Sequence, residues 1–296
     1  MRRRAFTALM TLVLLFAAPA AAMAAINEAY RPQDEFKLDP WFSIGPIEFN
    51  KAVFYILIAT ALTCWTMIYT ARRMQERPNR LQTVVEGAYT LMRDNITRGN
   101  MPDRMAAKWF PFIATIFLFI WFSNIIGYLP LPTNTEHKVN IFGAHIPTFA
   151  LYAATANLSV PLVLTLMVWI SYHVEGIRAK GFTGYLKSWI PSGVEGFARG
   201  PIFVIEVISH FVRLVSLSVR LFANILAGHL LILFMGGGLV VLLNVAVGLA
   251  VVLGIVTGAL AVAFFIFEVG LVATLQAFIF ATLTAIYLGG AVAAEH

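Results

Sequence analysis

Ionisable and polar side chains recur within one apolar stretch of this 296-residue chain. On an α-helix, which turns about 100° per residue, they fall within an arc of about 120°. They form a polar stripe that consists of Glu206, Ser209, His210, Arg213, Ser216, Arg220 and Asn224. Ionisable residues at membrane depth are costly, so they usually face a water-filled path or a partner charge. The stripe therefore predicts an ion or proton path; the structural alternative is a buried ion pair between Glu206 and His210 or Arg213.

The charged residues of this region differ in whether they can release a proton. Arg220 stays protonated at any useful pH, so it repels cations and attracts a carboxylate but cannot relay a proton. Proton carriers are available at Glu206, His210, His229 and Glu268. A fixed cation with titratable groups on either side is the arrangement that stops ions from leaking straight through. The proton acceptor must then be a carboxylate that visits both sides, which we infer is supplied by a partner subunit.

Helical geometry suggests two separate access paths. His229 comes out roughly opposite Arg220 on a regular helix, toward the segment that bears Glu268. We therefore expect His229 and Glu268 to line one path, which opens to the outside. Glu206 lies fourteen residues before Arg220, about 21 Å along a straight helix, and is expected to line the opposite, inner path.

The composition is that of a polytopic membrane protein. The chain is 59% hydrophobic and 12% charged, whereas a soluble domain has about 25% charged residues. The single cysteine, Cys64, excludes an intramolecular disulfide and a CxxC redox site. The net charge of +6 is spread around apolar segments, which does not favour nucleic-acid binding. The sequence lacks a GxxxxGK[ST] loop, a metal-ligand spacing and a GxSxG elbow, so we expect no bound nucleotide, cofactor or metal and no serine hydrolase activity.

The N-terminal part of the chain has the pattern of a secreted segment. Residues 1–24 combine three arginines, an apolar core and a small-residue site, which predicts a cleaved signal peptide; the alternative is an uncleaved short anchor. Residues 25–51 are polar and contain three prolines, which predicts an external segment without a long helix. Residues 52–296 then form a single integral-membrane domain.

Three apolar segments that precede the polar stripe have the length of a membrane span. They are residues 52–69, 109–129 and 148–172. Basic residues follow the first and the third, which places those ends in the cytoplasm and residues 131–147 outside. Residues 79–98 carry apolar side chains at intervals of three or four and are expected to form an amphipathic helix on the cytoplasmic membrane face.

The C-terminal half predicts long helices. The polar-striped helix, residues 201–235, would be about 50 Å long, so it must tilt, bend or emerge. We expect it to end at Gly236–Gly238. Residues 239–292 would span about 80 Å as one helix, so they form either two spans or one long tilted helix with an added loop or half-span. No Lys or Arg follows Arg220, so the charge rule does not place the C-terminus.

Two motifs give the chain a resemblance to a known family. The segment SLSVRLFANILAGH, Ser216–His229, resembles the arginine motif of subunit a of F-type ATP synthases. The segment LQAFIFATLTAIY, Leu275–Tyr287, is similar to the glutamine motif of the same family. A weaker match is NIIGYLP, which begins at Asn124 and has Gly127 where many bacterial members have an aspartate. The resemblance covers roughly residues 40 to 290.

The resemblance implies a role for each matching residue. Arg220 looks like the essential arginine that faces the carboxylates of the c-subunit ring, and Gln276 like the glutamine beside it. The positions that match lining residues of the aqueous half-channels are Glu206, Ser216, Asn224 and His229. Members commonly place an acid or histidine seven residues before the motif glutamine, which here is Val269. Glu268 is one residue earlier, a turn of about 100° on a regular helix, unless the backbone is distorted near Gly270.

The resemblance also implies an architecture and partners. The fold is expected to be an all-α membrane protein with about five membrane-embedded helices and one amphipathic interfacial helix, the two C-terminal helices being long and strongly tilted. The expected partners are the c-subunit ring, b-type peripheral stalk subunits and membrane lipid, in a bacterial plasma (inner) membrane with the C-terminus in the cytoplasm. The chain would be a proton-translocating stator subunit and not an enzyme by itself. The alternative is a self-contained ion-coupled secondary transporter, although the inverted repeats typical of that class are not visible.

Overall fold

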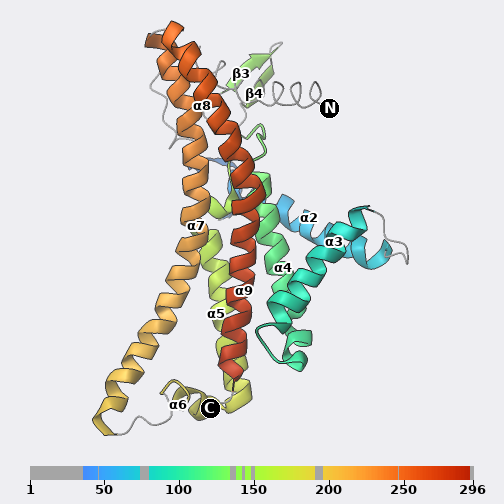
Figure 1. Ribbon diagram of the computed structural model, residues 1–296, viewed down its shortest axis with the longest axis vertical. Helices are drawn as coiled ribbons and strands as arrows, with labels where there is room; N and C mark the ends of the chain where they lie inside the picture. Colours follow the sequence, from blue (N-terminus) through green and yellow to red (C-terminus); the bar gives the residue numbers. More distant parts are fainter. Residues whose placement is uncertain are drawn as a thin grey trace. The chain divides into compact units, whose positions relative to one another are not determined.

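The computed structural model describes residues 36–45, 47–73, 80–133, 138–141, 144–147, 151–190, 196–245 and 247–293. The expected signal peptide, residues 1–24, lies outside these residues. The described chain is almost entirely helical (Figure 1). The α-helices are α2 (Lys51–Arg73), α3 (Arg80–Thr90), α4 (Asp103–Gly127), α5 (Ser159–Lys180), α6 (Phe182–Lys187), α7 (Arg199–Val245), α8 (Val247–Phe267) and α9 (Ala273–Val292).

Shorter helical segments connect or interrupt these helices. Two are π-helical, η2 (Leu91–Arg98) directly after α3 and η5 (Glu268–Val272) between α8 and α9. Two are 3₁₀ turns, η3 (Ala154–Ala156) and η4 (Gly196–Ala198). A helix is therefore present over residues 80–98, where the amphipathic helix was expected.

Five helical stretches of the described chain are long and apolar enough to cross a membrane. They are Lys51–Arg72, Asp103–Gly127, Ser159–Lys180, Gly196–Met235 and Gly254–Val292. Because backbone polar groups have no water to bond in hydrocarbon, apolar segments of this length satisfy them internally as helices. The prediction of an all-α, multi-pass membrane protein with two long C-terminal helices is confirmed.

The polar-striped helix does not end where the sequence suggested. Helix α7 continues through Gly236–Gly238 to Val245, so the expected break at the three glycines is wrong, and the next helix begins at Val247 rather than at residue 239. A glycine disfavours a helix by about 1 kcal/mol relative to alanine. An unbonded backbone group in hydrocarbon costs several kcal/mol, which outweighs that preference and keeps the segment helical.

The third span also differs from its predicted bounds. It was expected to begin at residue 148, but α5 begins at Ser159 and ends at Lys180. The side chain of Asn157 accepts a hydrogen bond of 3.0 Å from the Ser159 backbone amide, and Pro161 lies in the first helical turn. An amide acceptor and a first-turn proline are both typical of a helix N-terminus, which explains the later start.

Two small antiparallel hairpins were not expected. Strand β1 (Pro40–Ile44) pairs with β2 (Ile47–Asn50), and β3 (Lys138–Ile141) pairs with β4 (Ala144–Pro147). In the first hairpin Gly45 has a φ of 63°, the left-handed conformation that a two-residue connection requires. The first hairpin lies in the segment expected to be external, and the second in the loop between the second and third spans.

The chain divides into two compact units. Unit 1 comprises residues 1–56, 124–154 and 224–274, and unit 2 comprises residues 57–123, 155–223 and 275–296. In unit 1 the end of α4 approaches residues 151–154 so closely that a methyl group on Gly127 would overlap Ala153. In unit 2 an ion pair of 2.6 Å joins Lys108 of α4 to Glu175 of α5. In the same unit Gly289 of α9 lies against the Asn100 carbonyl without room for a side chain.

Candidate functional site

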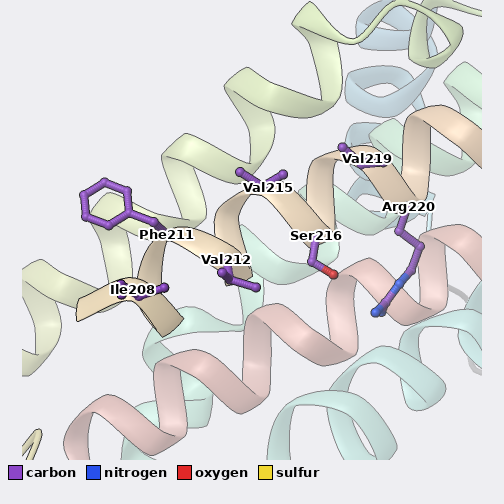
Figure 2. A pocket seen from close by; sticks show the side chains of 7 residues that line it. All are labelled: Ile208, Phe211, Val212, Val215, Ser216, Val219 and Arg220. Atoms are coloured by element: carbon purple, nitrogen blue, oxygen red, sulfur yellow. The ribbon is translucent and has the colours of Figure 1, made fainter. Parts of the chain in front are cut away.

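Arg220 lies on an exposed face of α7. Its side chain lines a shallow pocket of about 610 Å³. The other lining residues are Ile208, Phe211, Val212, Val215, Ser216 and Val219 (Figure 2). Figure 2 shows Ser216 and Arg220 projecting from the same side of the helix. Within the described part of the chain Arg220 forms neither an ion pair nor a hydrogen bond. A permanent charge in an apolar surface is costly to cover, so this face suits a partner that brings a carboxylate.

The first part of the polar stripe contains an ion pair. Arg213 Nη2 donates to Glu206 Oε1 at 3.0 Å, and His210 Nε2 lies 3.8 Å from the same oxygen. An ion pair between Glu206 and Arg213 is therefore present, as in the structural alternative raised for the stripe, but both side chains are partly exposed rather than buried. Arg220 takes no part in such a pair within the described chain. Among the described residues of the stripe it is the arginine whose charge has no partner.

His210 is buried against α5. A hydrogen bond of 2.9 Å joins its Nδ1 to the Tyr172 hydroxyl, and Trp169 Nε1 donates to the His210 carbonyl at 3.2 Å. The sequence analysis did not identify Tyr172 or Trp169. An aromatic residue near the end of an apolar span usually marks the membrane interface, so its local sequence gives no signal of this contact.

A second cluster, which we call the Tyr128 cluster, consists of Tyr128, His229 and Glu268 in unit 1. The Tyr128 hydroxyl donates to Glu268 Oε2 at 2.9 Å, and its ring centroid lies 4.4 Å from that of His229. All three side chains are buried. His229 and Glu268 thus both contact Tyr128. The sequence did not predict a role for this tyrosine, because nothing in the segment NIIGYLP distinguishes it from other aromatic residues.

His229 has an acceptor at each ring nitrogen. Its Nδ1 lies 2.9 Å from the Ile225 carbonyl oxygen, and its Nε2 lies 3.0 Å from the Gly127 carbonyl oxygen. A neutral imidazole has one N–H and can donate to one of these oxygens, whereas the protonated ring donates to both. Both ring nitrogens therefore have partners only in the protonated ring, because in the neutral ring the unprotonated nitrogen faces a carbonyl oxygen and no donor.

The neighbouring glycine makes room for the carboxylate of the Tyr128 cluster. A methyl group on Gly228 would lie 2.5 Å from Glu268 Cδ and 2.8 Å from Oε1, which is overlap rather than contact. Residue 228 can therefore carry no side chain while Glu268 keeps its position. This gives a physical reason for glycine directly before His229 in the arginine motif.

Glu268 begins the π-helical segment η5, which contains Gly270. A π-turn holds one residue more than an α-turn. This is the size of the offset between Glu268 and the position, residue 269, at which the family commonly has its acid or histidine. The backbone distortion considered for Gly270 is therefore present, and its one extra residue is equal in size to the one-residue offset.

The remaining predicted residues are distributed over both units. Asn124 is buried, and its side-chain amide donates to the Ala273 carbonyl at 3.3 Å within unit 1. Asn224, also in unit 1, is exposed, as is Ser216 in unit 2. Gln276 is buried in unit 2, and no hydrogen bond joins it to Arg220 in the described chain. Among the described residues, no group of three His, Cys, Asp or Glu side chains is arranged to hold a metal ion.

Comparison with known proteins gives a consistent result. Residues 53–289 match the family model of the ATP synthase A chain. The chain is 35% identical to ATP synthase subunit a of Maricaulis maris over 253 residues, which is 84% of this chain and 91% of that one. It is 34% identical to the Bradyrhizobium diazoefficiens protein of the same name over 271 residues, 90% of this chain and 98% of that one. The subunit a of Rubrobacter xylanophilus is 32% identical over 252 residues, 84% of this chain and 86% of that one.

Proposed function

The chain belongs to the ATP synthase A chain family, and on this premise we propose that it is the proton-translocating stator subunit of the membrane sector. It would provide two aqueous half-channels, separated by Arg220, that lead to and from the carboxylates of a rotating c-subunit ring. The observation that supports this most directly is the exposed, unpaired Arg220 in an apolar face of α7. Such a face is unfavourable in lipid alone and suits an apolar partner that carries one carboxylate.

Arg220 acts in this proposal as an electrostatic barrier. Its guanidinium remains charged, so it attracts each arriving carboxylate and makes that group release its proton. It also repels hydronium, so protons cannot pass directly from one half-channel to the other. Gln276 would then orient the arginine from α9, as the resemblance implies.

The Tyr128 cluster would line the outer half-channel, together with Asn124. Protons would move between water and the rotor through Glu268 and His229. The Tyr128 hydroxyl positions Glu268, and the Gly127 carbonyl positions His229. Imidazole and carboxyl groups both exist in two protonation states, so each can take up a proton and release it. The inner half-channel would be lined by Glu206, His210, Ser216 and Asn224.

The proposed partners follow from these surfaces. The exposed pocket face of α7 would contact the c-subunit ring, and b-type peripheral stalk subunits would hold the chain still against the rotor. Nucleotide chemistry would take place elsewhere in the complex, with this chain serving as a non-catalytic part. We do not propose the self-contained transporter, because residues 53–289 match the family model continuously.

Replacing His229 with glutamine tests the outer path. We expect ATP-driven proton pumping in inverted vesicles to slow several-fold without uncoupling, because Arg220 still blocks the direct leak. Glutamine can donate to the Gly127 carbonyl but cannot titrate, so the dependence of pumping on pH should flatten. If the complex instead assembles poorly and the remainder keeps an unchanged pH profile, His229 is only a structural hydrogen-bond donor.

The proposed orientation places residues 25–51 and 131–147 outside and the C-terminus in the cytoplasm of a bacterial inner membrane. Cys64 is exposed, so it must first be replaced by serine. We expect an impermeant thiol reagent to label Lys138→Cys only from outside and Lys187→Cys only from the cytoplasm, since the second follows the basic end of α5. Labelling of Lys138→Cys from the cytoplasmic side alone would contradict this orientation.

A further inference from the structure

Two histidines of unit 2, His210 buried and His173 partly buried, form a close pair near the end of α5. The ring centroids of His173, from α5, and His210, from α7, are 4.8 Å apart. Each Nδ1 is hydrogen-bonded to a tyrosine hydroxyl, His173 to Tyr185 at 2.7 Å and His210 to Tyr172 at 2.9 Å. Each Nε2 is buried and has no hydrogen-bond partner in the described chain. The two residues therefore present the same unsatisfied atom on neighbouring rings.

The surroundings of the pair are aromatic with one carboxylate. The Trp169 ring centroid lies 4.1 Å from that of His173, and the Trp189 ring centroid lies 4.4 Å from that of His210. Glu206 Oε1, which Arg213 holds at 3.0 Å, is 3.8 Å from His210 Nε2. Buried polar atoms are nearly always bonded to protein or ordered water, and a buried water typically has two to four polar partners. The two Nε2 atoms and Glu206 can supply them.

We propose that His173 and His210, bridged by one water molecule that also bonds Glu206, form the cytoplasmic mouth of the inner proton path, with Tyr185 as its outermost member. This rests on the proposed function and extends it to α5 and α6, which carry none of the residues assigned above. The hydrogen-bonded chain would run from Tyr185 to His173, through the water to His210 and Glu206. Each member can accept one proton and release another, so nothing is consumed.

Tyr185 is placed by a close contact between α6 and α5. A methyl group on Gly176 would lie 2.7 Å from Tyr185 Cδ2, which is overlap with the ring. Burial, the largest cause, raises the pKa of Tyr185 above its ordinary value, so its hydroxyl stays protonated and can both donate and accept. The charged and titratable groups that face the pair are Glu206 and Arg213 of α7, Tyr172 of α5, Tyr185 of α6 and, beneath Arg213, Tyr287 of α9.

The test uses the whole complex in inverted vesicles, with ATP-driven proton pumping measured as a function of pH. We expect His173→Gln to slow pumping several-fold and to flatten its pH dependence, because glutamine keeps a hydrogen bond but cannot titrate. Tyr185→Phe should slow pumping less, and the double variant should be no slower than His173→Gln, since both lie on one path. Tyr89→Phe, the same change at an exposed site of unit 2, should have no effect.

A matched glycine pair tests the positioning of Tyr185. Gly176→Ala should slow pumping as Tyr185→Phe does, whereas Gly184→Ala, whose methyl meets only Lys180 Cβ at 3.6 Å, should not. Unchanged pumping and pH profile in both His173→Gln and Tyr185→Phe would overturn the relay. If His173→Gln impairs assembly, the pumping rate of Tyr185→Phe compared with that of Tyr89→Phe decides instead. Loss of pumping in Arg220→Ala, with normal pumping in both His173→Gln and Tyr185→Phe, would reject this inference but not the proposed function. Normal pumping in Arg220→Ala would reject the proposed function.

Discussion

Arg220→Ala is expected to abolish coupled proton transport while the subunit remains inserted in the membrane. Alanine removes a permanent charge that is exposed and, within the described residues, unpaired on the apolar face of α7. Without it, an arriving carboxylate has no reason to release its proton, and the barrier between the half-channels is lost. ATP-driven pumping should therefore fall to background, and passive proton flux through the membrane sector should rise.

The control is Val204→Ala, an exposed residue of α7 that does not line this pocket, which removes apolar surface but no charge and should leave pumping near normal. Arg220→Lys should not restore transport, because a desolvated ammonium can lose its proton and has a different donor geometry. Both variants need an immunoblot of the membrane fraction to show that the subunit is present at normal amount. Pumping near the wild-type rate in Arg220→Ala would refute the assignment of this residue.

Gly228→Ala is expected to cause the second-largest loss of transport, with little loss of stability. The added methyl overlaps the carboxylate of Glu268, which is the far end of a flexible side chain and can move without a shift of the backbone. The hydrogen bond from Tyr128 to Glu268 would then be lost. Since the carboxylate would leave the proton path, we expect pumping to slow about tenfold, which corresponds to about 1.4 kcal/mol in the barrier to proton transfer.

Gly258→Ala is the matched control, since a methyl there meets nothing within 4 Å and lies in the same unit. Tyr128→Phe should reproduce much of the Gly228→Ala effect, and the double variant should be less than additive because both changes remove one interaction. Thermal unfolding of the purified complex should be nearly the same for Gly228→Ala and Gly258→Ala. Equal pumping by these two variants would show that the position of the Glu268 carboxylate does not matter for transport.

Local patterns in the sequence were sufficient to predict the membrane-spanning helices and the side chains that share one face of α7. Hydropathy over some twenty residues predicts a span because lipid permits few other backbone structures, and five such stretches are present. Helical periodicity predicts that Ser216 and Arg220 project together, because the angle between them depends only on their own helix. The ends of helices were less predictable, because hydrogen bonds at a helix end outweigh the helix propensity of single residues. Helix α7 continues through Gly236–Gly238, and α5 starts at Ser159.

Contacts between distant segments were decided by the tertiary structure alone. Tyr128 and Glu268 are 140 positions apart, and Tyr172 and His210 are 38 apart, with no local pattern that links either pair. Periodicity fixes the direction of a side chain around its own helix but not which residue of another helix it meets. That depends on close approach at small residues such as Gly228 and Gly176, where the absence of a Cβ brings Glu268 and Tyr185 into place. The sequence therefore identified the charged residues, and packing selected the tyrosines that hold them.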